Sequence, residues 1–255
     1  MSKIIKEHIT ALLEKGMRED GRKFLEYRKP VTIEYGISPK AAEGSARVKI
    51  GDTEVVAGVK MGIGVPFPDT PDEGALMIGV ELIPLSNPSF ETGPPDIEAI
   101  EMSRVIDRGI RESKVIDLKK LCIKKGEKVW MVMIDIYPIN DAGNLYDACG
   151  LAACAALKDA RFPTLDEKNF TVDYKKKTSK KLPLGDMPVG VTVVKIKDKL
   201  ILDPITQEWD NLDARLSVFS MPGGELCALQ KGGDSPLSED NIFQMIDIAV
   251  DKAKD

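Results

Sequence analysis

The chain has 255 residues, of which 43% are hydrophobic and 30% are charged, so it can bury the core of one large or two small globular domains. Its 41 acidic residues outnumber its 36 lysines and arginines, which gives a formal net charge of -5. A protein that coats nucleic acid over its whole surface needs an excess of positive charge, so any contact with RNA or DNA must be local.

Several residue types are scarce, and their scarcity excludes whole classes of protein. The first residues carry charges and lack the apolar core of a signal peptide, and no apolar run is long enough to span a bilayer. His8 is the only histidine, which excludes the serine–histidine–aspartate and cysteine–histidine schemes. The four cysteines form no C-x-x-C pair and have apolar neighbours, as expected for reduced thiols in a cytoplasmic protein without a zinc site.

Residues 1–30 predict an N-terminal helix followed by an arm. Isoleucines and leucines recur at helical spacing until Gly16, and residues 17–22 are typical of a polar turn. Beyond the arm, strands are predicted at residues 31–35, 46–50 and 53–59. The last two strands flank Gly51-Asp52 and should form a β-hairpin.

Residues 96–113 predict an amphipathic helix with three arginines along one side. Apolar side chains recur on one face, while Arg104, Arg108 and Arg111 follow each other at i, i+4 and i+7 on the other. At a rise of 1.5 Å per residue this arginine row spans roughly 10 Å and can touch two or three successive phosphates. The alternative is a solvated face, with the arginines in weak surface ion pairs to neighbouring acids.

A long apolar stretch and a helix of small residues follow. Residues 129–137 are nearly all apolar, which predicts a central strand covered on both faces. Residues 147–158 predict a helix of alanine, glycine, cysteine and leucine that packs in the core. Residues 31–165 then form a first structural half.

Lysines cluster in residues 166–186, which we expect to link two halves of the chain. Such a run is usually a solvated linker, and the alternative is a docking patch for an acidic partner or an RNA backbone. Residues 187–255 repeat the earlier pattern of hairpins followed by a helix. The chain is therefore predicted to be α+β, with helices packed on mixed sheets.

Five motifs follow one another over nearly the whole chain. They are Arg18–Arg22 (REDGR), residues 44–59, Ser103–Arg111 (SRVIDRGIR), Asp135–Asp147 (DIYPINDAGNLYD) and Gly185–Val191 (GDMPVGV). In this order they resemble the RNase PH family, and most closely the non-catalytic RNase PH-like subunit of the archaeal exosome core. The resemblance implies an RNase PH-like fold of two βαβα-type halves, similar to ribosomal protein S5 domain 2.

Active members of this family degrade RNA from the 3′ end by phosphorolysis, in which inorganic phosphate attacks the terminal phosphodiester and releases a nucleoside diphosphate. The resemblance places their phosphate-binding sequence G-G-T-R-[ST] on residues 142–146, which here read Ala-Gly-Asn-Leu-Tyr. Leu145 thus replaces the arginine, and burying a phosphate dianion without that charge is costly. We therefore expect this chain to have lost the phosphate site.

The catalytic carboxylates of active members are displaced as well. When the family pattern is aligned on Leu202-Asp203, their two aspartates fall on Trp209 and Arg215, although a shift of one residue would place Asp210 first. Four acids in this region could form a metal cluster or a polar loop between strands: Asp203, Glu208, Asp210 and Asp213.

The resemblance implies a cytoplasmic ring subunit with no catalytic residue, metal or cofactor of its own. Its partners would be a catalytic paralogue in a hexameric ring (a trimer of heterodimers), RNA-binding cap subunits and single-stranded RNA. Arg104, Arg108 and Arg111 match the family's strand-holding helix and are expected to bind the RNA backbone. Two alternatives stay open: a self-sufficient phosphate-dependent 3′ to 5′ exoribonuclease that uses Asp210 and Asp213, and a purely structural ring spacer.

Overall fold

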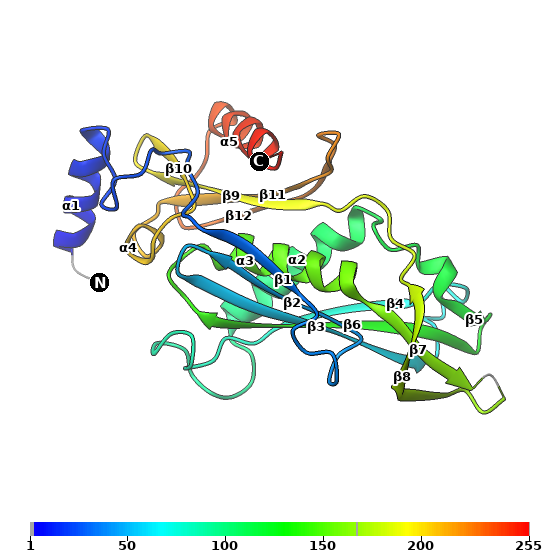
Figure 1. Ribbon diagram of the computed structural model, residues 1–255. Helices are drawn as coiled ribbons and strands as arrows, with labels where there is room; N and C mark the ends of the chain where they lie inside the picture. Colours follow the sequence, from blue (N-terminus) through cyan, green and yellow to red (C-terminus); the bar gives the residue numbers. More distant parts are fainter. Residues whose placement is uncertain (1–2, 167, 255) are drawn as a thin grey trace.

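The computed structural model of the chain describes residues 3–166 and 168–254, and it has an α+β architecture in layers (Figure 1). Two helices lie between a large sheet and a smaller one, and a third helix covers the outer face of the smaller sheet. The helices are α1 (Lys3–Glu14), α2 (Ile97–Glu112), α3 (Leu145–Asp159), α4 (Thr206–Trp209) and α5 (Glu239–Lys252), with a 3-10 turn η1 (Leu118–Leu121). None of the helices within these ranges is long and apolar enough to cross a membrane.

The large sheet has the order β1-β2-β3-β6-β4, and β5 pairs with β6 at one end. Its strands are β1 (Val31–Tyr35), β2 (Gly44–Ile50), β3 (Thr53–Gly64), β4 (Ala75–Val80), β5 (Cys122–Lys124) and β6 (Lys128–Asn140). The sheet is mixed because β4 runs parallel to β6. The predicted hairpin is present, since Ile50 pairs with Thr53 across the two-residue turn.

The smaller sheet has the order β10-β9-β11-β12 and is antiparallel at each pairing. Its strands are β9 (Val189–Ile196), β10 (Lys199–Leu202), β11 (Ala214–Ser220) and β12 (Leu226–Gly232). Met245 and Ala249 of α5 pack against Val193 and Val218 in a core of their own. Helices α2 and α3 fill the space below, so the two sheets share one helical layer.

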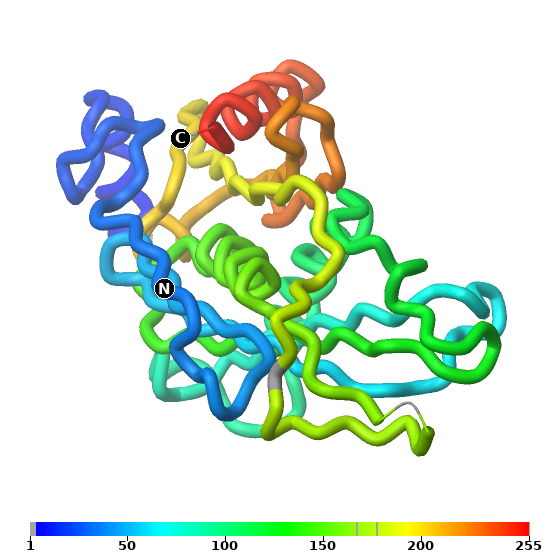
Figure 2. The backbone as a smooth tube through the Cα atoms, turned by 45° about the vertical axis from the view of Figure 1, so that its right-hand side comes forward, coloured from blue at the N-terminus to red at the C-terminus, as the bar shows by residue number. Residues whose placement is uncertain are grey.

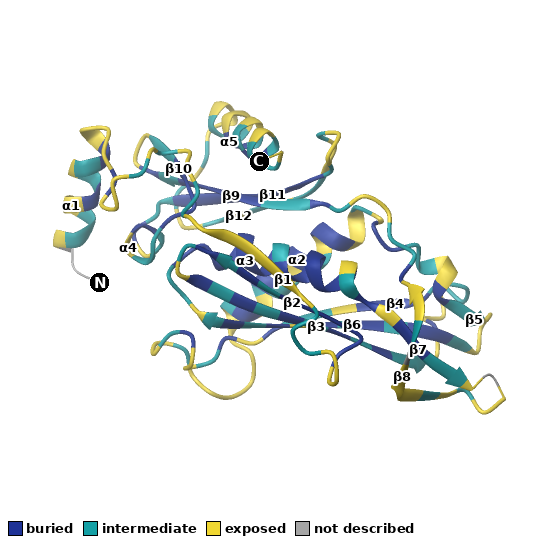
Figure 3. Ribbon diagram, viewed as in Figure 1, coloured by how far each residue is buried: buried dark blue, intermediate teal, exposed yellow. Residues whose placement is uncertain are grey.

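The central strand β6 differs from its prediction. Its inward side chains, such as Val132, Ile134 and Ile136, are fully buried, but Met131 and Met133 on the other face are only partly buried. In the described chain no helix packs on this outer face, so the prediction of cover on both faces is wrong. The alternation of buried and partly exposed residues is visible in Figure 3.

The lysine-rich stretch that the sequence predicts as a linker is mostly an ordered hairpin. Strand β8 (Thr171–Lys181) pairs with β7 (Arg161–Asp166), and the hairpin projects from the end of the molecule opposite α1 (Figure 2). Residue 167 and the side chain of Lys177 lie outside the described part of this segment. Only a short connection from Leu182 remains before β9.

Arg18 was predicted in a polar turn, but its side chain is fully buried. Its Nε donates to Oε1 of Glu208 over 2.9 Å, and its Nη1 and Nη2 donate to the carbonyls of Leu202 (2.9 Å) and Asp203 (3.0 Å). The side chains of Arg18 and Glu208 are 0% and 1% exposed. The N-terminal arm is therefore clamped onto the second half of the chain, 190 residues away in sequence.

Replacing Arg18 should destabilise the fold strongly. Arg18→Met leaves the carboxylate of Glu208 buried without its partner, which should lower the free energy of unfolding by about 3–5 kcal/mol. Lys6→Met breaks the half-exposed pair with Asp213 and should cost at most about 1 kcal/mol. Urea unfolding of both variants measures the difference. Equal losses of unfolding free energy would show that the buried Arg18–Glu208 pair stabilises the fold no more than the half-exposed Lys6–Asp213 pair.

Candidate functional site

The predicted arginine helix is present as α2. Asp96 caps its N-terminus by accepting a hydrogen bond of 2.8 Å from the backbone N–H of Ala99. Met102, Val105 and Ile106 are buried against the core, as the apolar periodicity predicts. One face of α2 is therefore fixed by packing, and the other is turned outward.

The arginine row lies on the outward face, but its three members differ. Arg104 and Arg108 are exposed. The side chain of Arg104 makes no hydrogen bond or ion pair within the described chain, and the side chain of Arg108 donates to that of Gln230 on β12. Arg111 is engaged by Asp107 (2.7 and 3.0 Å) and by the carbonyl of Leu76 (2.9 Å). The hydrogen bonds that Arg111 donates to Asp107 raise the pKa of Arg111. The Arg104 guanidinium is thus unpaired within the described chain, and that of Arg108 is engaged only through Nη2.

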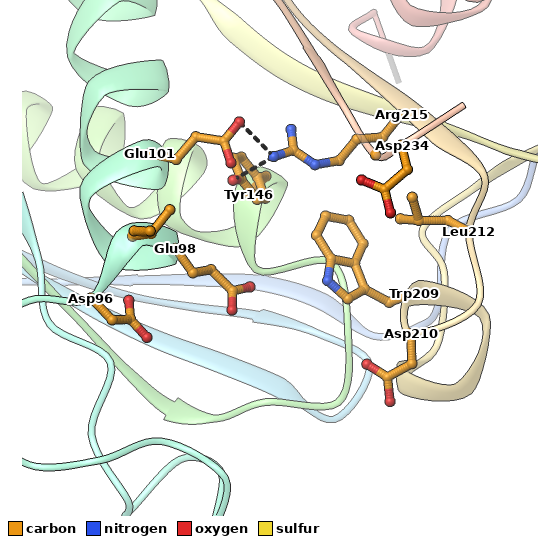
Figure 4. Close-up of a pocket in the computed structure, with 11 residues that line it drawn as sticks. Asp96, Glu98, Glu101, Tyr146, Trp209, Asp210, Leu212, Arg215 and Asp234 are labelled. Carbon is orange, nitrogen blue, oxygen red and sulfur yellow. Dashed lines mark hydrogen bonds and ion pairs between the residues drawn. The ribbon is translucent and has the colours of Figure 1, made fainter. Parts of the chain in front are cut away.

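The first half of α2 faces a pocket of about 770 Å³ (Figure 4). Its walls come from α2, α3, α4 and the segments around β11. Five acids line it: Asp96, Glu98, Glu101, Asp210 and Asp234. Among its lining residues Arg215 is the only cation, so carboxylates dominate the charge of the pocket.

Arg215 is committed to the protein. Its side chain is only 6% exposed, and Nη2 contacts Glu101 at 2.9 Å and the Tyr146 hydroxyl at 2.7 Å (Figure 4). Its guanidinium carbon lies 4.1 Å from the centre of the Tyr146 ring and 5.7 Å from that of Trp209. Trp209 and Arg215, on which one of the two alignments considered above places the family's aspartates, thus form a packed wall of the pocket.

A second pocket of about 400 Å³ adjoins the first, because Glu98, Trp209 and Asp210 line both. It lies at the N-terminus of α3, where Asp141, Gly143 and Asn144 contribute to its wall. Three carboxylates and no lysine or arginine are among its lining residues. Burial raises the pKa of Glu98, and the nearby Asp96 and Asp141 raise it further. The same two effects, burial and then Asp141, raise the pKa of Asp210.

The turn of residues 142–146 leads into α3, and other side chains bind its backbone at Ala142 and Gly143. Gly143 and Asn144 adopt left-handed conformations with φ of +98° and +56°. The N–H of Gly143 donates to Asp141 (2.9 Å), and the carbonyls of Ala142 and Gly143 accept from Arg28 (2.6 and 2.9 Å). A Cβ at Gly143 would lie 2.3 Å from the carbonyl oxygen of Pro204, so the turn packs directly on the loop before α4.

A buried ionic network holds this turn in place. Asp203 is fully buried and accepts from Arg22 (3.1 Å), Arg28 (2.7 and 2.8 Å) and the Asn144 amide (3.0 Å). The same amide donates to Asp147 at 3.0 Å, and the Tyr27 hydroxyl donates to Asp147 at 2.8 Å. The network joins the arm, the turn and the loop before α4.

Sequence reasoning missed the partners of the arm because they lie more than a hundred residues away along the chain. The only local signal was the density of arginines in the arm, which the sequence analysis assigned to a polar turn and to a family motif. A charge pattern alone does not show whether an arginine is solvated or buried against a distant carboxylate. The pairing became visible only with the fold.

The four acids proposed as a metal cluster do not converge. Asp203 pairs with Arg22 and Arg28, Glu208 with Arg18, and Asp213 with Lys6 (2.9 Å) and the N–H of Lys197 (2.6 Å). Only Asp210 lines the pockets. Among the described residues no group of three histidine, cysteine or acidic side chains is placed to hold a metal. All four acids lie in the segment between β10 and β11, as the alternative of a polar loop between strands predicts, but Asp203 and Glu208 are buried in it.

With this geometry in place, comparison with known proteins gives the family. Residues 27–163 match domain 1 of the 3′ exoribonuclease family (RNase PH), and residues 186–252 match its domain 2. The chain belongs to the 3′ exoribonuclease family. The RNase PH-like fold predicted from the sequence motifs is thereby confirmed.

Relatives of this 3′ exoribonuclease family member match it along nearly its whole length. It is similar to the exosome complex component Rrp42 of Methanothermobacter thermautotrophicus, at 45% identity over 98% of this chain and 91% of the relative. A chain of the Archaeoglobus fulgidus exosome with RNA bound to the active site is 43% identical with a TM-score of 0.89, covering 98% of this chain and 95% of that one. A chain of an archaeal exosome core is 40% identical with a TM-score of 0.86, at 98% and 94% coverage.

The buried network should make the stability of this family member depend on pH through Asp147. Burial raises the pKa of Asp147 from its ordinary value of 3.8 to about 7. The contribution of the protonated carboxyl to the free energy of unfolding is therefore complete below pH 3.8. It is lost as the pH rises from 3.8 to about 7.

Asp147→Asn removes this titration while keeping the shape of the side chain. Relative to the unaltered chain, the variant should gain about 2 kcal/mol of unfolding free energy between about pH 5 and about pH 8. Urea unfolding across that range measures the difference. A difference between the two proteins that stays constant with pH would contradict the raised pKa.

Proposed function

We propose that this chain is a non-catalytic subunit of a ring-shaped exosome that degrades RNA from the 3′ end by phosphorolysis. In this proposal it alternates with a catalytic paralogue in a hexameric ring and works in the cytoplasm with RNA-binding cap subunits. The full-length similarity to proteins named as exosome components supports the assembly. The A. fulgidus structure, whose complex holds RNA, supports the substrate class.

One observation carries the non-catalytic role: the space at the turn of residues 142–146 is lined by acids. Orthophosphate would approach Asp141, Glu98 and Asp210 without a lysine or arginine among the lining residues to offset their charge. Burial raises the pKa values of Glu98 and Asp210, and repulsion from neighbouring acids, Asp141 among them, raises both further. An additional dianion in this space would be strongly disfavoured.

The charge distribution along α2 supports a role in holding RNA. Its first two turns present Glu98 and Glu101 to the pocket, while Arg104 and Arg108 in the following turns are exposed to solvent. These two arginines are about 6 Å apart along the helix axis, which suits neighbouring phosphates of an extended strand. A polyanion would therefore be attracted to the second half of the helix and repelled from the first. In the assembled ring, this polarity would direct the 3′ end to the paralogue's site.

The two rival functions have less support. A self-sufficient exoribonuclease using Asp210 and Asp213 would need both carboxylates at one site, but Asp213 is occupied by Lys6 and the N–H of Lys197. A purely structural role does not account for Arg104, because this side chain is exposed and makes no ion pair within the described chain.

The purified chain should release no nucleoside diphosphate by itself. Incubation with oligo(A), phosphate and magnesium should yield no ADP, because the acid-lined space does not admit phosphate. Adding the catalytic paralogue should start ADP release, which shows that substrate and conditions are suitable. ADP release by the chain alone would overturn the non-catalytic role.

Reversing the charge of the two exposed arginines should weaken RNA binding by the assembled complex. Arg104→Glu with Arg108→Glu should lower the affinity for oligo(A) and flatten the plot of log K against log[salt] by about one to two units, since fewer phosphates are neutralised.

The matched control is Lys124→Glu with Lys125→Glu, which changes the same charge at lysines that already have acidic neighbours. The control should bind RNA normally. If the arginine variant assembles into the complex and binds RNA normally, the RNA-holding role is wrong and the role of a structural spacer remains.

A further inference from the structure

The β7–β8 hairpin is a second concentration of positive charge, distinct from α2. Strand β8 contains five lysines and a single aspartate in a chain whose net charge is -5. Lys175, Lys176, Lys180 and Lys181 are all exposed. The hairpin projects away from the layered body, and much of strand β8 is coloured as exposed (Figures 1 and 3).

These lysines are not neutralised within the described chain. None of the four exposed lysines forms an ion pair there. The two described acids of the hairpin are used locally: Asp166 accepts from the N–H of Lys168, and Asp173 accepts from the N–H of Lys175, both at 3.0 Å. The positive charge is therefore available to an external anion.

The hairpin backbone is held in one conformation by cross-strand bonds. The Thr178 hydroxyl donates to the carbonyl of Phe162 (2.7 Å), and the Thr164 hydroxyl donates to that of Lys176 (2.9 Å). Phe162 is buried and packs edge-on against Trp130 at 5.4 Å between ring centres. A rigid backbone lowers the entropic cost of arranging charges for a ligand.

An aromatic ring lies beside these lysines. Thr164 pairs with Asp173 and Pro163 with residue 177, so residues 174–176 form a bulge on β8. The bulge carries Tyr174, which is 48% exposed. Its ring is held by the Lys60 ammonium, 4.6 Å from the ring centre, and Lys60 is in turn paired with Glu43 at 3.3 Å. The Tyr174 ring is thus held in place by Lys60, while about half of the residue's surface remains accessible to solvent.

We infer that the β7–β8 hairpin is a second RNA contact, in which Lys175, Lys176 and Lys181 bind the phosphate backbone and Tyr174 stacks on a base. The inference deepens the proposed function and rests on it. Residues 175–181 extend over roughly 20 Å, long enough to follow several nucleotides of an extended strand. Lysines beside an exposed aromatic ring are the combination by which proteins bind single strands without reading their sequence.

An acidic protein segment is the other polyanion that the lysines would fit. It would need only the positive charge, whereas a nucleic acid also offers flat bases to Tyr174. The exposed and fixed ring therefore favours RNA. This distinction also supplies the test, because charge and ring can be changed separately.

The charge is tested with Lys175→Gln, Lys176→Gln and Lys181→Gln combined in the assembled complex. Binding of fluorescent oligo(A), measured against salt, should lose about two units of slope, because each phosphate contact on a single strand contributes about 0.7. The control is Lys120→Gln, Lys124→Gln and Lys125→Gln, which removes the same charge from lysines that already have acidic partners. The control should keep the original slope.

The ring is tested with Tyr174→Ser and Tyr174→Phe. Tyr174→Ser should weaken oligo(A) binding about 5-fold or more, and Tyr174→Phe should retain it, since stacking needs the ring and not the hydroxyl. Binding of a polyglutamate peptide is measured in parallel. If the lysine variant weakens polyglutamate and RNA equally while Tyr174→Ser changes neither, the partner is an acidic protein and the inference is overturned.

Failure of this inference can be told apart from failure of the proposed function. Unchanged RNA binding in the hairpin variants, together with a loss in the Arg104 and Arg108 variant, overturns the hairpin contact alone. Unchanged binding in both sets overturns the RNA role as a whole.

Discussion

The burial of one carboxylate, that of Asp203, imposes the arrangement on which the candidate site depends. A charge without solvent is tolerated only when cations and hydrogen-bond donors surround it, and here Arg22, Arg28 and Asn144 supply them. These residues belong to the N-terminal arm and to the turn before α3, while Asp203 precedes α4. Because the charge must be compensated, the three segments are held together, and the turn and the α4 segment contribute to the wall of the second pocket.

The same compensation determines what the pockets can bind. Arg28 donates to Asp203 and to the carbonyls of the turn, and Nη2 of Arg215 donates to Glu101 and Tyr146. Among the described residues Arg215 is the one cation that lines the first pocket, and it is paired with Glu101, while Glu98 and Asp210 line both pockets. In the function we propose, a family fold that elsewhere handles phosphate at this place instead keeps anions out. In the same proposal, RNA contacts the exposed Arg104 and Arg108 of α2 instead.

Local patterns predicted well wherever a short stretch decides its own structure. The β2–β3 hairpin, the amphipathic α2 and the fold class all followed from periodicity, turn residues and motif order. The errors arose where the outcome depends on distant residues. Arg18 looked like a turn residue because Glu208 could not be foreseen beside it, and the lysine-rich stretch looked like a linker because its pairing with β7 is a tertiary feature.

The sequence by itself therefore determined the elements, the family and the absence of an arginine at residue 145, since each of these is a matter of residue identity or short-range spacing. Only the tertiary structure decided which charges are free. Arg104 and Arg108 remain available while Arg111, equal to them in the periodic pattern, is engaged by Asp107 and the carbonyl of Leu76. The physical reason is that desolvation and pairing depend on which side chains meet in space, and those partners come from every part of the chain.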